Sequence, residues 1–385
     1  MNIRQLMRAT AVAITKKRNT LFSISAKKQE EYLNGFNIPN SRLERSFFQY
    51  RCQMKEMGFV LSLFINVLSF PILLLYLYLT KRNKKVESEA SVRTVAFIEG
   101  DKFAELLSSE ELKSLEPISH VSHCPELFSS SDKAYVLSIW REHPCSFHFV
   151  LKILMKIRNY SFLIQVYHPE TIIVCSEYSF ASSALSDYCN QHNVKHYNVM
   201  HGEKLFFIRD SFFSFDRCYV WDEYYIKLFK DLKADEGQFV IDQPSMFRFL
   251  NTDSVKEFDY TYYLGNEQGR KLDNIMKVLE KLHLNGRRVA LRPHPLYTNL
   301  KEVYKKKQQY HFEIQLCSEI GIKESLQKTN AAISRYSTVL NQAQNNGICV
   351  VIDDVTNRKD YEKLAELRYI MLYKPHKLLS EILEC

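Results

Sequence analysis

A histidine and a glycine end an apolar, alternating stretch of the sequence, "HYNVMHGEKLFF" at 196–207. The pattern predicts a strand that stops at His201-Gly202 and releases Glu203 into a loop. A neutral imidazole can act as a general base near pH 7, and glycine permits a tight turn and a close backbone approach. Glu203 would either hold His201 or contact an acceptor hydroxyl. Taken alone, the stretch is more typical of a histidine that caps a strand, so it defines a candidate base and not yet a site.

A second histidine stands between two prolines in "RRVALRPHPLY" at 287–297, again at the end of an apolar run. The prolines stiffen the turn and fix the direction of His294, and Pro295 belongs to that turn. Arg292 can clamp a phosphate through two parallel hydrogen bonds. The alternative is a rigid turn that exposes a cation, and this motif alone does not decide between the two.

A third stretch, "SRYST" at 334–338, follows a short apolar run and opens a predicted helix. Ser337 or Thr338 would lie at the helix N-terminus, where free N–H groups favour an anion. Plain N-capping is the alternative, because serine and threonine are good caps. Arg335 beside them favours a phosphate, and Ser334 completes the candidate set.

Acidic residues end another predicted strand, "ICVVIDD" at 348–354. Asp353 and Asp354 would either bind a ribose or cap the following turn, and the cap is the simpler interpretation. The sequence has no DxD motif, so we expect no metal ion in the reaction.

From residue 92 the chain alternates apolar runs with helical patterns. The predicted strands are 94–100, 117–123, 171–177, 194–202, 217–223 and 238–243, and then 259–265, 287–295, 311–316, 331–334, 348–354 and 369–373. Nearly unbroken apolar strands separated by helices indicate parallel sheets covered on both faces. We therefore expect an α/β fold of two Rossmann-like domains, at 92–250 and 251–385. Ligands bind beyond the carboxyl ends of such strands, so a cleft between the domains would bring His201 and His294 face to face.

Composition separates the start of the chain from the rest. Hydrophobic residues make up 46% and charged residues 25%, which is typical of a folded globular chain. The nine cysteines include no CxxC pair, so we expect buried, reduced thiols in a cytosolic protein. The net charge of +8 is concentrated in a basic segment at 1–57. Such a segment can bind nucleic acid or an anionic lipid surface.

The next segment favours lipid. Residues 58–79, "GFVLSLFINVLSFPILLLYLYL", carry no charge and are followed by the cations of "TKRNKK" in a linker at 80–91. About 20 apolar residues can span a bilayer as a helix. Because Pro71 can break a helix, a re-entrant hairpin with both ends in the cytosol, or an interfacial segment, is an alternative, and a buried core helix is a third. The cations on the two sides are nearly balanced, so the positive-inside rule does not set the orientation.

The three motifs together resemble those of GT-B-fold glycosyltransferases of bacterial surface-polysaccharide synthesis. "MHG" and "RPHP" are similar to motifs of the CDP-glycerol and CDP-ribitol polyol-phosphate transferases, and the histidine and later Ser/Thr motifs are similar to those of bacterial sialyl- and polysialyltransferases. The resemblance covers about residues 92–385. It implies that His201 is the base, that His294 contacts or protonates the donor phosphate, and that Ser337 and Thr338 hold that phosphate. The donor-binding set that it implies also contains Gly202, Arg292, Pro295, Ser334 and Arg335.

The sequence departs from the sialyltransferase pattern at two places. The strand end that carries an acidic pair in those enzymes is Met200-His201-Gly202 here, and the literal "DEG" at 235–237 comes after that strand. Many GT-B enzymes also place a glutamate in the helix after the phosphate loop to hold the ribose. Asn341 and Gln342 occupy that helix here, so ribose contacts are in doubt.

The function that these features imply is that of a membrane-associated, metal-independent glycosyltransferase without a cofactor. It would move a sugar from a CMP- or UDP-linked donor onto a glycan or lipid-linked acceptor of a bacterial surface polymer such as capsule, O-antigen or lipooligosaccharide. Residues 92–250 would bind the acceptor, residues 251–385 the donor, and residues 1–85 the cytoplasmic face of the inner membrane. Alternatives are a CDP-polyol phosphotransferase, a nucleotide-sugar epimerase, and a non-catalytic membrane scaffold of a polysaccharide assembly complex. Nucleic-acid binding ranks last, because no recognisable binding fold is present.

Overall fold

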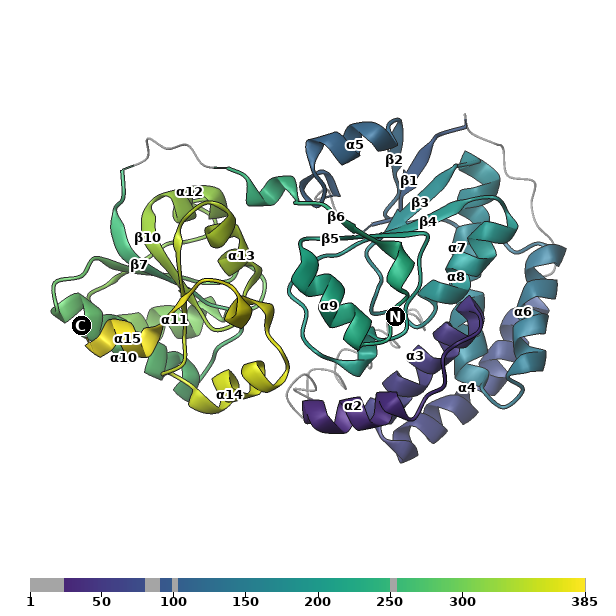
Figure 1. Cartoon of the computed structure of the whole chain (residues 1–385), viewed down its shortest axis with the longest axis horizontal. Helices are drawn as coiled ribbons and strands as arrows, with labels where there is room; N and C mark the ends of the chain where they lie inside the picture. Colours follow the sequence, from purple (N-terminus) through teal and green to yellow (C-terminus); the bar gives the residue numbers. More distant parts are fainter. Residues whose placement is uncertain (1–23, 80–90, 99–102, 250–254, 385) are drawn as a thin grey trace. The chain divides into compact units, whose positions relative to one another are not determined.

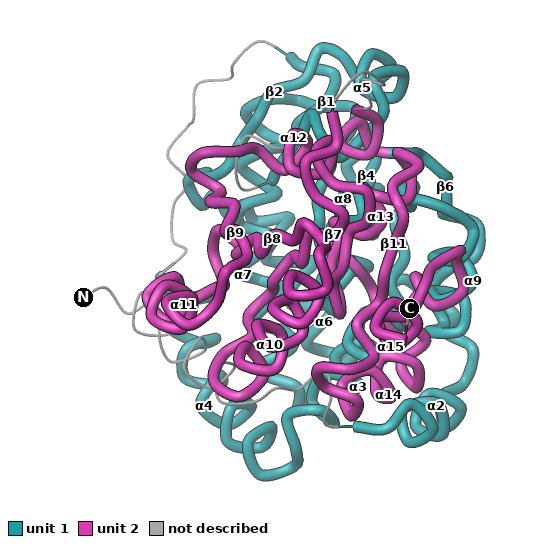
Figure 2. The backbone as a smooth tube through the Cα atoms, turned by 90° about the vertical axis from the view of Figure 1, so that its left-hand side faces the viewer, with its two compact units in different colours: residues 1–201, 206–243 teal, residues 202–205, 244–385 magenta. Residues whose placement is uncertain are grey.

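The computed structural model describes residues 24–79, 91–98, 103–249 and 255–384. They form two compact units (Figures 1 and 2). Unit 1 holds the residues up to His201 together with Phe206–Gln243, and unit 2 holds Gly202–Leu205 together with the residues from Pro244 onward. The chain thus passes from unit 1 to unit 2 a few residues before 250, and each unit is described by itself below.

Unit 1 is built on a six-stranded parallel sheet in the order β2-β1-β3-β4-β5-β6. Its strands are β1 Thr94–Ala96, β2 Ile118–His120, β3 Thr171–Val174, β4 Lys195–Val199, β5 Arg217–Val220 and β6 Phe239–Ile241. All four residues of β3 are buried, as expected for a strand covered on both faces. The predicted strands of the first half of the chain are confirmed, each one shorter than the apolar run that indicated it.

The described helices of unit 1 pack around this sheet and on one another. They are α2 Ala26–Asn34, α3 Arg42–Met57, α4 Phe59–Leu79, α5 Ser109–Leu115, α6 Ser130–Glu142, α7 Phe147–Tyr167, α8 Ser182–Gln191 and α9 Glu223–Asp231. Helix α7 buries residues along its whole length, among them Phe149, Ile153 and Leu163. Helices α5 and α6 were not predicted. The signal for α6 was its capping box, in which Ser129 and Asp132 satisfy each other's backbone N–H groups.

The described part of the basic segment, residues 24–57, packs onto unit 1. Arg42 of α3 forms an ion pair with Asp216 at 2.9 Å, and the Gln49 side chain donates to the Glu177 carbonyl oxygen at 2.9 Å. Phe48 meets Phe212 edge to face. Several of the cations and amides in this segment therefore bind protein groups.

The hydrophobic segment forms one continuous helix, α4, with Pro71 inside it. The re-entrant hairpin is therefore wrong as a conformation for Phe59–Leu79. Proline removes one backbone hydrogen bond, and the flanking turns keep the helix continuous. Within the described residues, α4 is the one helix long and apolar enough to cross a membrane by length and composition.

Unit 2 is built on a second six-stranded parallel sheet, in the order β12-β11-β10-β7-β8-β9. Its strands are β7 Phe258–Tyr263, β8 Val289–Arg292, β9 Glu313–Ile314, β10 Thr329–Ser334, β11 Cys349–Ile352 and β12 Lys377–Leu378. The helices are α10 Arg270–Leu284, α11 Leu300–Lys307, α12 Ile322–Gln327, α13 Thr338–Asn345, α14 Arg358–Glu366 and α15 Leu379–Glu384. The two parallel sheets confirm the predicted α/β class of two Rossmann-like halves.

One predicted strand of unit 2 is wrong. The run at 369–373 forms a 3₁₀ turn, Ile370–Tyr373, and the edge strand β12 follows it at Lys377–Leu378. Ile370 and Met371 are fully buried, so the run is apolar for packing reasons. A short apolar run without periodicity fits a buried turn as well as a strand.

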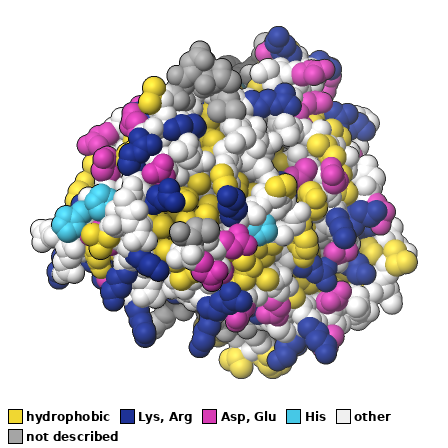
Figure 3. Space-filling view, turned by 60° about the vertical axis from the view of Figure 1, so that its left-hand side comes forward, with side chains coloured by type: hydrophobic (Ala, Val, Ile, Leu, Met, Phe, Trp, Pro, Cys, Tyr) yellow, Lys and Arg dark blue, Asp and Glu magenta, His cyan; other side chains and the backbone are white. Residues whose placement is uncertain are grey.

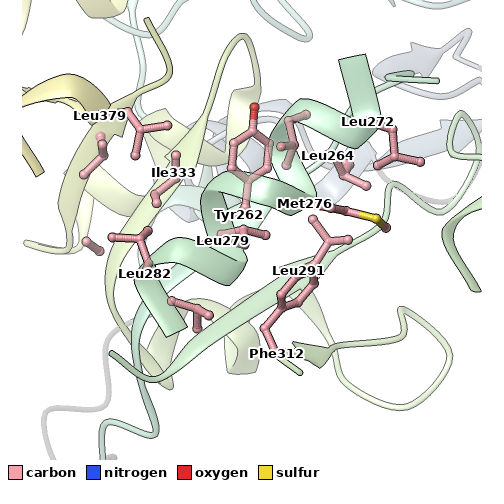
Figure 4. Packing of buried hydrophobic residues seen from close by; sticks show 14 of the residues in the cluster. Tyr262, Leu264, Leu272, Met276, Leu279, Leu282, Leu291, Phe312, Ile333 and Leu379 are labelled. Atoms are coloured by element: carbon pink, nitrogen blue, oxygen red, sulfur yellow. The ribbon is translucent and has the colours of Figure 1, made fainter. Parts of the chain in front are cut away.

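The core of unit 2 is the apolar stripe of α10 against β7, β8 and β10 (Figure 4). Leu272, Met276 and Leu279 recur at helical spacing and are buried. They pack with Tyr262 and the other labelled side chains of the cluster in Figure 4. The packed stripe holds the sheet so that the loops after its strands share one edge.

The eight described cysteines are free thiols. Cys52, Cys189 and Cys218 are buried, while Cys145 is exposed and the others are half-buried. Burial as predicted thus holds for three of the eight, and Cys385 lies outside the described residues.

His196 in β4 is a fully buried histidine of the unit 1 core. Its Nε2 lies 2.8 Å from the Tyr160 hydroxyl and its Nδ1 lies 2.8 Å from the Ser186 hydroxyl. Burial lowers the pKa of His196 to about 3, because the charged ring would lose its hydration. The ring is therefore neutral in the folded chain at physiological pH.

This burial predicts a pH dependence of stability. In the unfolded chain His196 binds a proton with a pKa of about 6.5, whereas in the folded chain its pKa is about 3. Stability from this residue is thus complete above pH 6.5 and falls as the pH falls. When the pH is lowered from 7 to 5, the unfolding free energy of the parent chain should fall by about 2 kcal/mol more than that of His196→Gln.

Urea unfolding at the two pH values checks this difference. The exposed His123 of the same unit is the matched control, and His123→Gln should follow the parent chain. Equal losses in His196→Gln and the parent would contradict a neutral, buried His196.

Candidate functional site

In unit 1, His201 follows the carboxyl end of β4 with its side chain half exposed. Its Nδ1 lies 3.8 Å from Oε1 of Glu177, a carboxylate with 0% of its side chain exposed. Gly202 has a φ of +68°, a left-handed conformation that favours glycine. The turn predicted at His201-Gly202 is confirmed, and it leaves the imidazole at the edge of the sheet beside a buried acid.

Glu177 is a site residue that the sequence analysis missed. It follows β3, the neighbour of β4, so both residues lie at the carboxyl edge of the sheet. The Asn198 amide donates to its carboxylate at 3.1 Å, which fixes the carboxylate in place. The signal was present, since Glu177 is the acid that ends the apolar run "TIIVCSE". A fixed carboxylate beside an imidazole orients a base and stabilises its protonated form.

In unit 2, His294 follows the carboxyl end of β8 and its ring has a fixed tautomer. Nδ1 accepts from the backbone N–H groups of Leu296 at 3.1 Å and Tyr297 at 3.3 Å. The ring also stacks on Tyr297, with centroids 4.5 Å apart. Because Nδ1 accepts, the neutral ring carries its proton on Nε2. The ring is thereby made a hydrogen-bond donor through Nε2.

The turn around His294 is tied to the neighbouring strand. The backbone N–H of His294 donates to the Thr298 hydroxyl at 2.7 Å, and that hydroxyl donates to the Gly265 carbonyl after β7 at 2.9 Å. Pro295 is exposed at the outside of the turn. The predicted rigidity is therefore supplied by hydrogen bonds as well as by the prolines.

Arg292, the last residue of β8, is 5% exposed. Its Nη2 donates to the Ile320 carbonyl oxygen at 2.8 Å, whereas its Nη1 is buried without a hydrogen-bond partner within the described residues. The exposed cation of the alternative interpretation is therefore wrong. Arg292 places a buried positive charge under the edge of the sheet, with one donor atom unsatisfied.

The stretch 334–338 joins β10 to α13. The buried Ser334 donates its hydroxyl to the Tyr263 carbonyl oxygen at 2.9 Å. Ser337 is the N-cap of α13 and accepts from the Val339 N–H at 3.2 Å. Thr338 is the first residue of the helix and is half-buried. Capping is thus what Ser337 does here, and phosphate binding by Ser337 and Thr338 stays a prediction.

Arg335 is enclosed by acids. Its Nη2 lies 3.1 Å from Glu267 and its Nη1 pairs with Asp360, while Lys271 also contacts Asp360 at 2.6 Å. Two cations therefore face two carboxylates. The predicted contribution of Arg335 to a positive phosphate site is offset by its own partners, which stand 68 residues before it and 25 residues after it in the sequence.

Glu203 belongs to the short segment that clusters with unit 2. Its carboxylate accepts from the Asn341 amide, and its carbonyl oxygen accepts from the Tyr336 hydroxyl at 2.9 Å. Asn341 in turn accepts from Lys374 at 2.8 Å. Asn341, which lies in the helix where the resemblance would place a ribose-binding glutamate, is therefore hydrogen-bonded to Glu203 and Lys374.

The acids of "VVIDD" cap, as the simpler interpretation predicted. Asp353 accepts from the N–H groups of Val355 at 3.0 Å and Thr356 at 2.9 Å, and from the Tyr262 hydroxyl at 2.6 Å. Among the described residues, no group of three His, Cys, Asp or Glu is placed to hold a metal ion. Metal independence of a reaction stays a prediction.

Two sets of site residues thus lie at the carboxyl edges of two parallel sheets. Unit 1 brings together His201 and Glu177, and unit 2 brings together the loops after β7, β8, β10 and β11. The strands β8 and β10 flank β7, so their ends are about 10 Å apart. The facing of His201 and His294 across a cleft stays a prediction.

No family model matches the sequence, and no curated protein matches it significantly. Among solved structures, the chain is similar to the UDP-GlcNAc 2-epimerase of Methanocaldococcus jannaschii, with 12% identity, a TM-score of 0.44, and coverage of 71% of this chain and 92% of that one. It is also similar to the wall teichoic acid polymerase TagF, with 12% identity, a TM-score of 0.41, and coverage of 85% and 89%. A third is the glycotransferase of kitacinnamycin, with 8% identity, a TM-score of 0.41, and coverage of 73% and 84%. Function is therefore argued below from the residues of this chain.

The charge balance around Arg335 predicts a structural role that can be measured. Arg335→Met leaves Glu267, which is 6% exposed, without its cation. Breaking such a buried pair is expected to cost about 3 kcal/mol of unfolding free energy. Urea unfolding followed by circular dichroism measures the loss.

An exposed arginine of the same unit provides the matched control. Arg288 is used for this purpose, because its side chain is 58% exposed and lies 3.6 Å from the partly exposed Asp259, so Arg288→Met should change stability by less than about 1 kcal/mol. An equally small effect of Arg335→Met would show that Arg335 does not need its acids and is available to a ligand.

Proposed function

We propose that this chain is a membrane-associated glycosyltransferase at the cytoplasmic face of the inner membrane. It moves a sugar from a nucleotide-activated donor onto the growing glycan of a bacterial surface polymer, and unit 2 binds the donor while unit 1 supplies the base. The observation that carries the proposal is the fixed ring of His294, whose Nδ1 accepts two backbone N–H groups and leaves Nε2 to donate at the carboxyl edge of a parallel sheet.

The donor phosphate would be held by neutral donors more than by free cations. The Nε2–H of His294 and the N–H groups in the first turn of α13, after the Ser337 cap, supply hydrogen bonds and the positive end of a helix dipole. Buried Arg292 adds a positive charge beneath them. Because Glu267 and Asp360 neutralise Arg335, Arg335 would fix the loop before α13 in place more than it would attract the phosphate. Such groups stabilise the negative charge that develops on the leaving phosphate.

The acceptor hydroxyl would be activated by His201. As the hydroxyl oxygen bonds to the anomeric carbon, the bond from that carbon to the phosphate oxygen breaks and its electron pair stays on the phosphate. The hydroxyl proton passes to His201, and the buried Glu177 carboxylate 3.8 Å away stabilises the imidazolium that forms. Gly202 keeps the backbone beside the imidazole free of a side chain.

Nucleotide binding tests the donor half of the proposal. The full chain is heated with CMP, CDP, UMP, UDP or GDP in turn. A nucleotide present at 100 times its Kd should raise the melting temperature by roughly 5–10 °C. His294→Ala should remove most of that rise.

His311→Ala is the matched control, because His311 precedes β9 at the opposite edge of the same sheet. It should keep the full rise. Stabilisation by UDP indicates an ordinary sugar donor, and stabilisation by CMP or CDP indicates the sialyl or polyol-phosphate chemistry of the resemblance. A folded chain that no nucleotide stabilises would contradict the proposal and favour the scaffold.

Transfer kinetics test the base. With a nucleotide sugar of the class identified by binding, His201→Gln is expected to lower kcat about 10²–10⁴-fold. The nucleotide-induced rise in melting temperature should stay unchanged, since His201 acts on the acceptor.

Glu177→Gln should lower kcat as well, with the donor KM unchanged, because it acts through His201. Tyr178→Phe is the conservative control. The Tyr178 ring centroid lies 6.0 Å from that of His201, and this substitution leaves the Glu177 carboxylate in place. Full activity of His201→Gln would exclude the imidazole as the base.

A further inference from the structure

Helix α4 of unit 1 has one face made of exposed apolar side chains. They are 38–81% exposed and comprise Phe59, Val60, Leu63, Phe64, Val67, Leu68, Phe70, Leu74, Leu75 and Tyr78. Their spacing of three, four and seven residues places them on one half of the helix surface. A contiguous apolar face of this size on a soluble unit marks a contact surface.

The opposite face of α4 is packed on unit 1. Ser69 is 4% exposed and Leu73 is fully buried. The Asn66 amide donates to the Cys145 carbonyl oxygen at 2.8 Å and accepts from the His148 N–H at 3.1 Å. A polar residue in the middle of α4 is thus used to fasten the helix to the start of α7.

The fastening continues along α7. Phe70 packs on Phe147 with ring centroids 4.6 Å apart, and the Arg158 guanidinium lies 5.1 Å from the Tyr76 ring centroid. From Asn66 to Tyr76 the helix therefore follows α7 in the same direction for about 15 Å. Half of α4 is bound lengthwise to unit 1.

This packing excludes a simple membrane span. Helix α7 lies in the core of unit 1, where Phe149, Ile153 and Ile157 are fully buried. If α4 crossed a bilayer, α7 and the sheet beneath it would lie at hydrocarbon depth. Lys156, exposed on α7, would then be a charged group inside the membrane, which is costly.

We infer that α4 lies in the plane of a membrane surface, with its exposed face in one leaflet and its inner face on α7. The partner is an anionic phospholipid bilayer. Between residues 51 and 85, the sequence has six cations and one acid, and the four cations at 81–85 lie outside the described residues. Basic groups that flank an apolar helix face attract anionic headgroups, and tyrosines such as Tyr78 favour the headgroup level. This inference specifies the membrane association of the proposed function, and the tests below do not depend on the transfer reaction.

The attachment also orients the site-bearing unit. Since α4 contacts α7 directly, unit 1 would be held at a fixed height and tilt, without a linker between helix and unit. The carboxyl edge that carries His201 and Glu177 would then keep one distance from the lipid headgroups.

Vesicle flotation of the full chain tests the contact. Binding to phosphatidylcholine vesicles should be weak and should strengthen when phosphatidylglycerol is included. Combined replacement of Phe64, Val67 and Leu75 by Gln removes exposed apolar groups without touching α7, and should weaken binding at least about 100-fold. Leu73→Ala, on the packed face, should lower the melting temperature and leave vesicle binding unchanged.

Depth measurement separates the in-plane helix from a span. Val60, Val67 and Leu74 are seven residues apart on the exposed face and are replaced by Trp one at a time. Lipids brominated at shallow or deep acyl positions then quench the added fluorescence. An in-plane helix gives one shallow depth at all three positions, whereas a span gives a deep middle and shallow ends and would overturn the inference. No vesicle binding by the folded chain, or a dimer that the triple variant dissolves, would also overturn it.

Discussion

The parallel sheet is the constraint on which both units depend. A parallel strand needs a crossover to return to the same edge, and the crossover helices bury both faces of the sheet. Every strand therefore releases its chain at one edge, where the apolar pattern stops. His201 and Glu177 share such an edge in unit 1, although they come from different strands. The loops after β7, β8 and β10 share another in unit 2, and hydrogen bonds such as that from Ser334 to Tyr263 join them. On the face shown in Figure 3, basic and acidic side chains are interspersed, which is typical of a solvated surface.

Charge at the unit 2 edge is managed by pairing. Arg335 looks like a phosphate ligand in sequence, because it opens the loop before a helix. In the fold, Glu267 and Asp360 surround it, and Lys271 restores neutrality. Removing such a charge from solution requires partners, since a lone buried cation loses its hydration. An anion at this edge would therefore contact hydrogen-bond donors and a helix N-terminus rather than a free cation. Such a setting suits a leaving phosphate, whose negative charge grows only as its bond to the sugar breaks.

The sequence was sufficient for what depends on local pattern. Alternation of strands and helices, the His201-Gly202 turn and the Asp353 cap each follow from residues close together in the chain. What failed depends on distant residues. The run at 369–373 is apolar because it fills the core as a turn. The partner of His201 is Glu177, on a neighbouring strand. The partners of Arg335 come from α14 and from the loop before α10. Pairings across a sheet or between loops leave no local pattern, and only the fold reveals them.

Helix α4 shows the same limit for a membrane segment. Its 21 residues fit the thickness of a bilayer. Length and composition, however, do not distinguish a helix that crosses the bilayer from one that lies in its surface. The deciding information is which side chains already have partners. Asn66 and Tyr76 are committed to α7, ten residues apart on one face. A helix bound lengthwise to a soluble core cannot leave it for the hydrocarbon without breaking those contacts. The exposed apolar face of α4 can still enter a single leaflet, because entry at that depth requires no movement of the sheet.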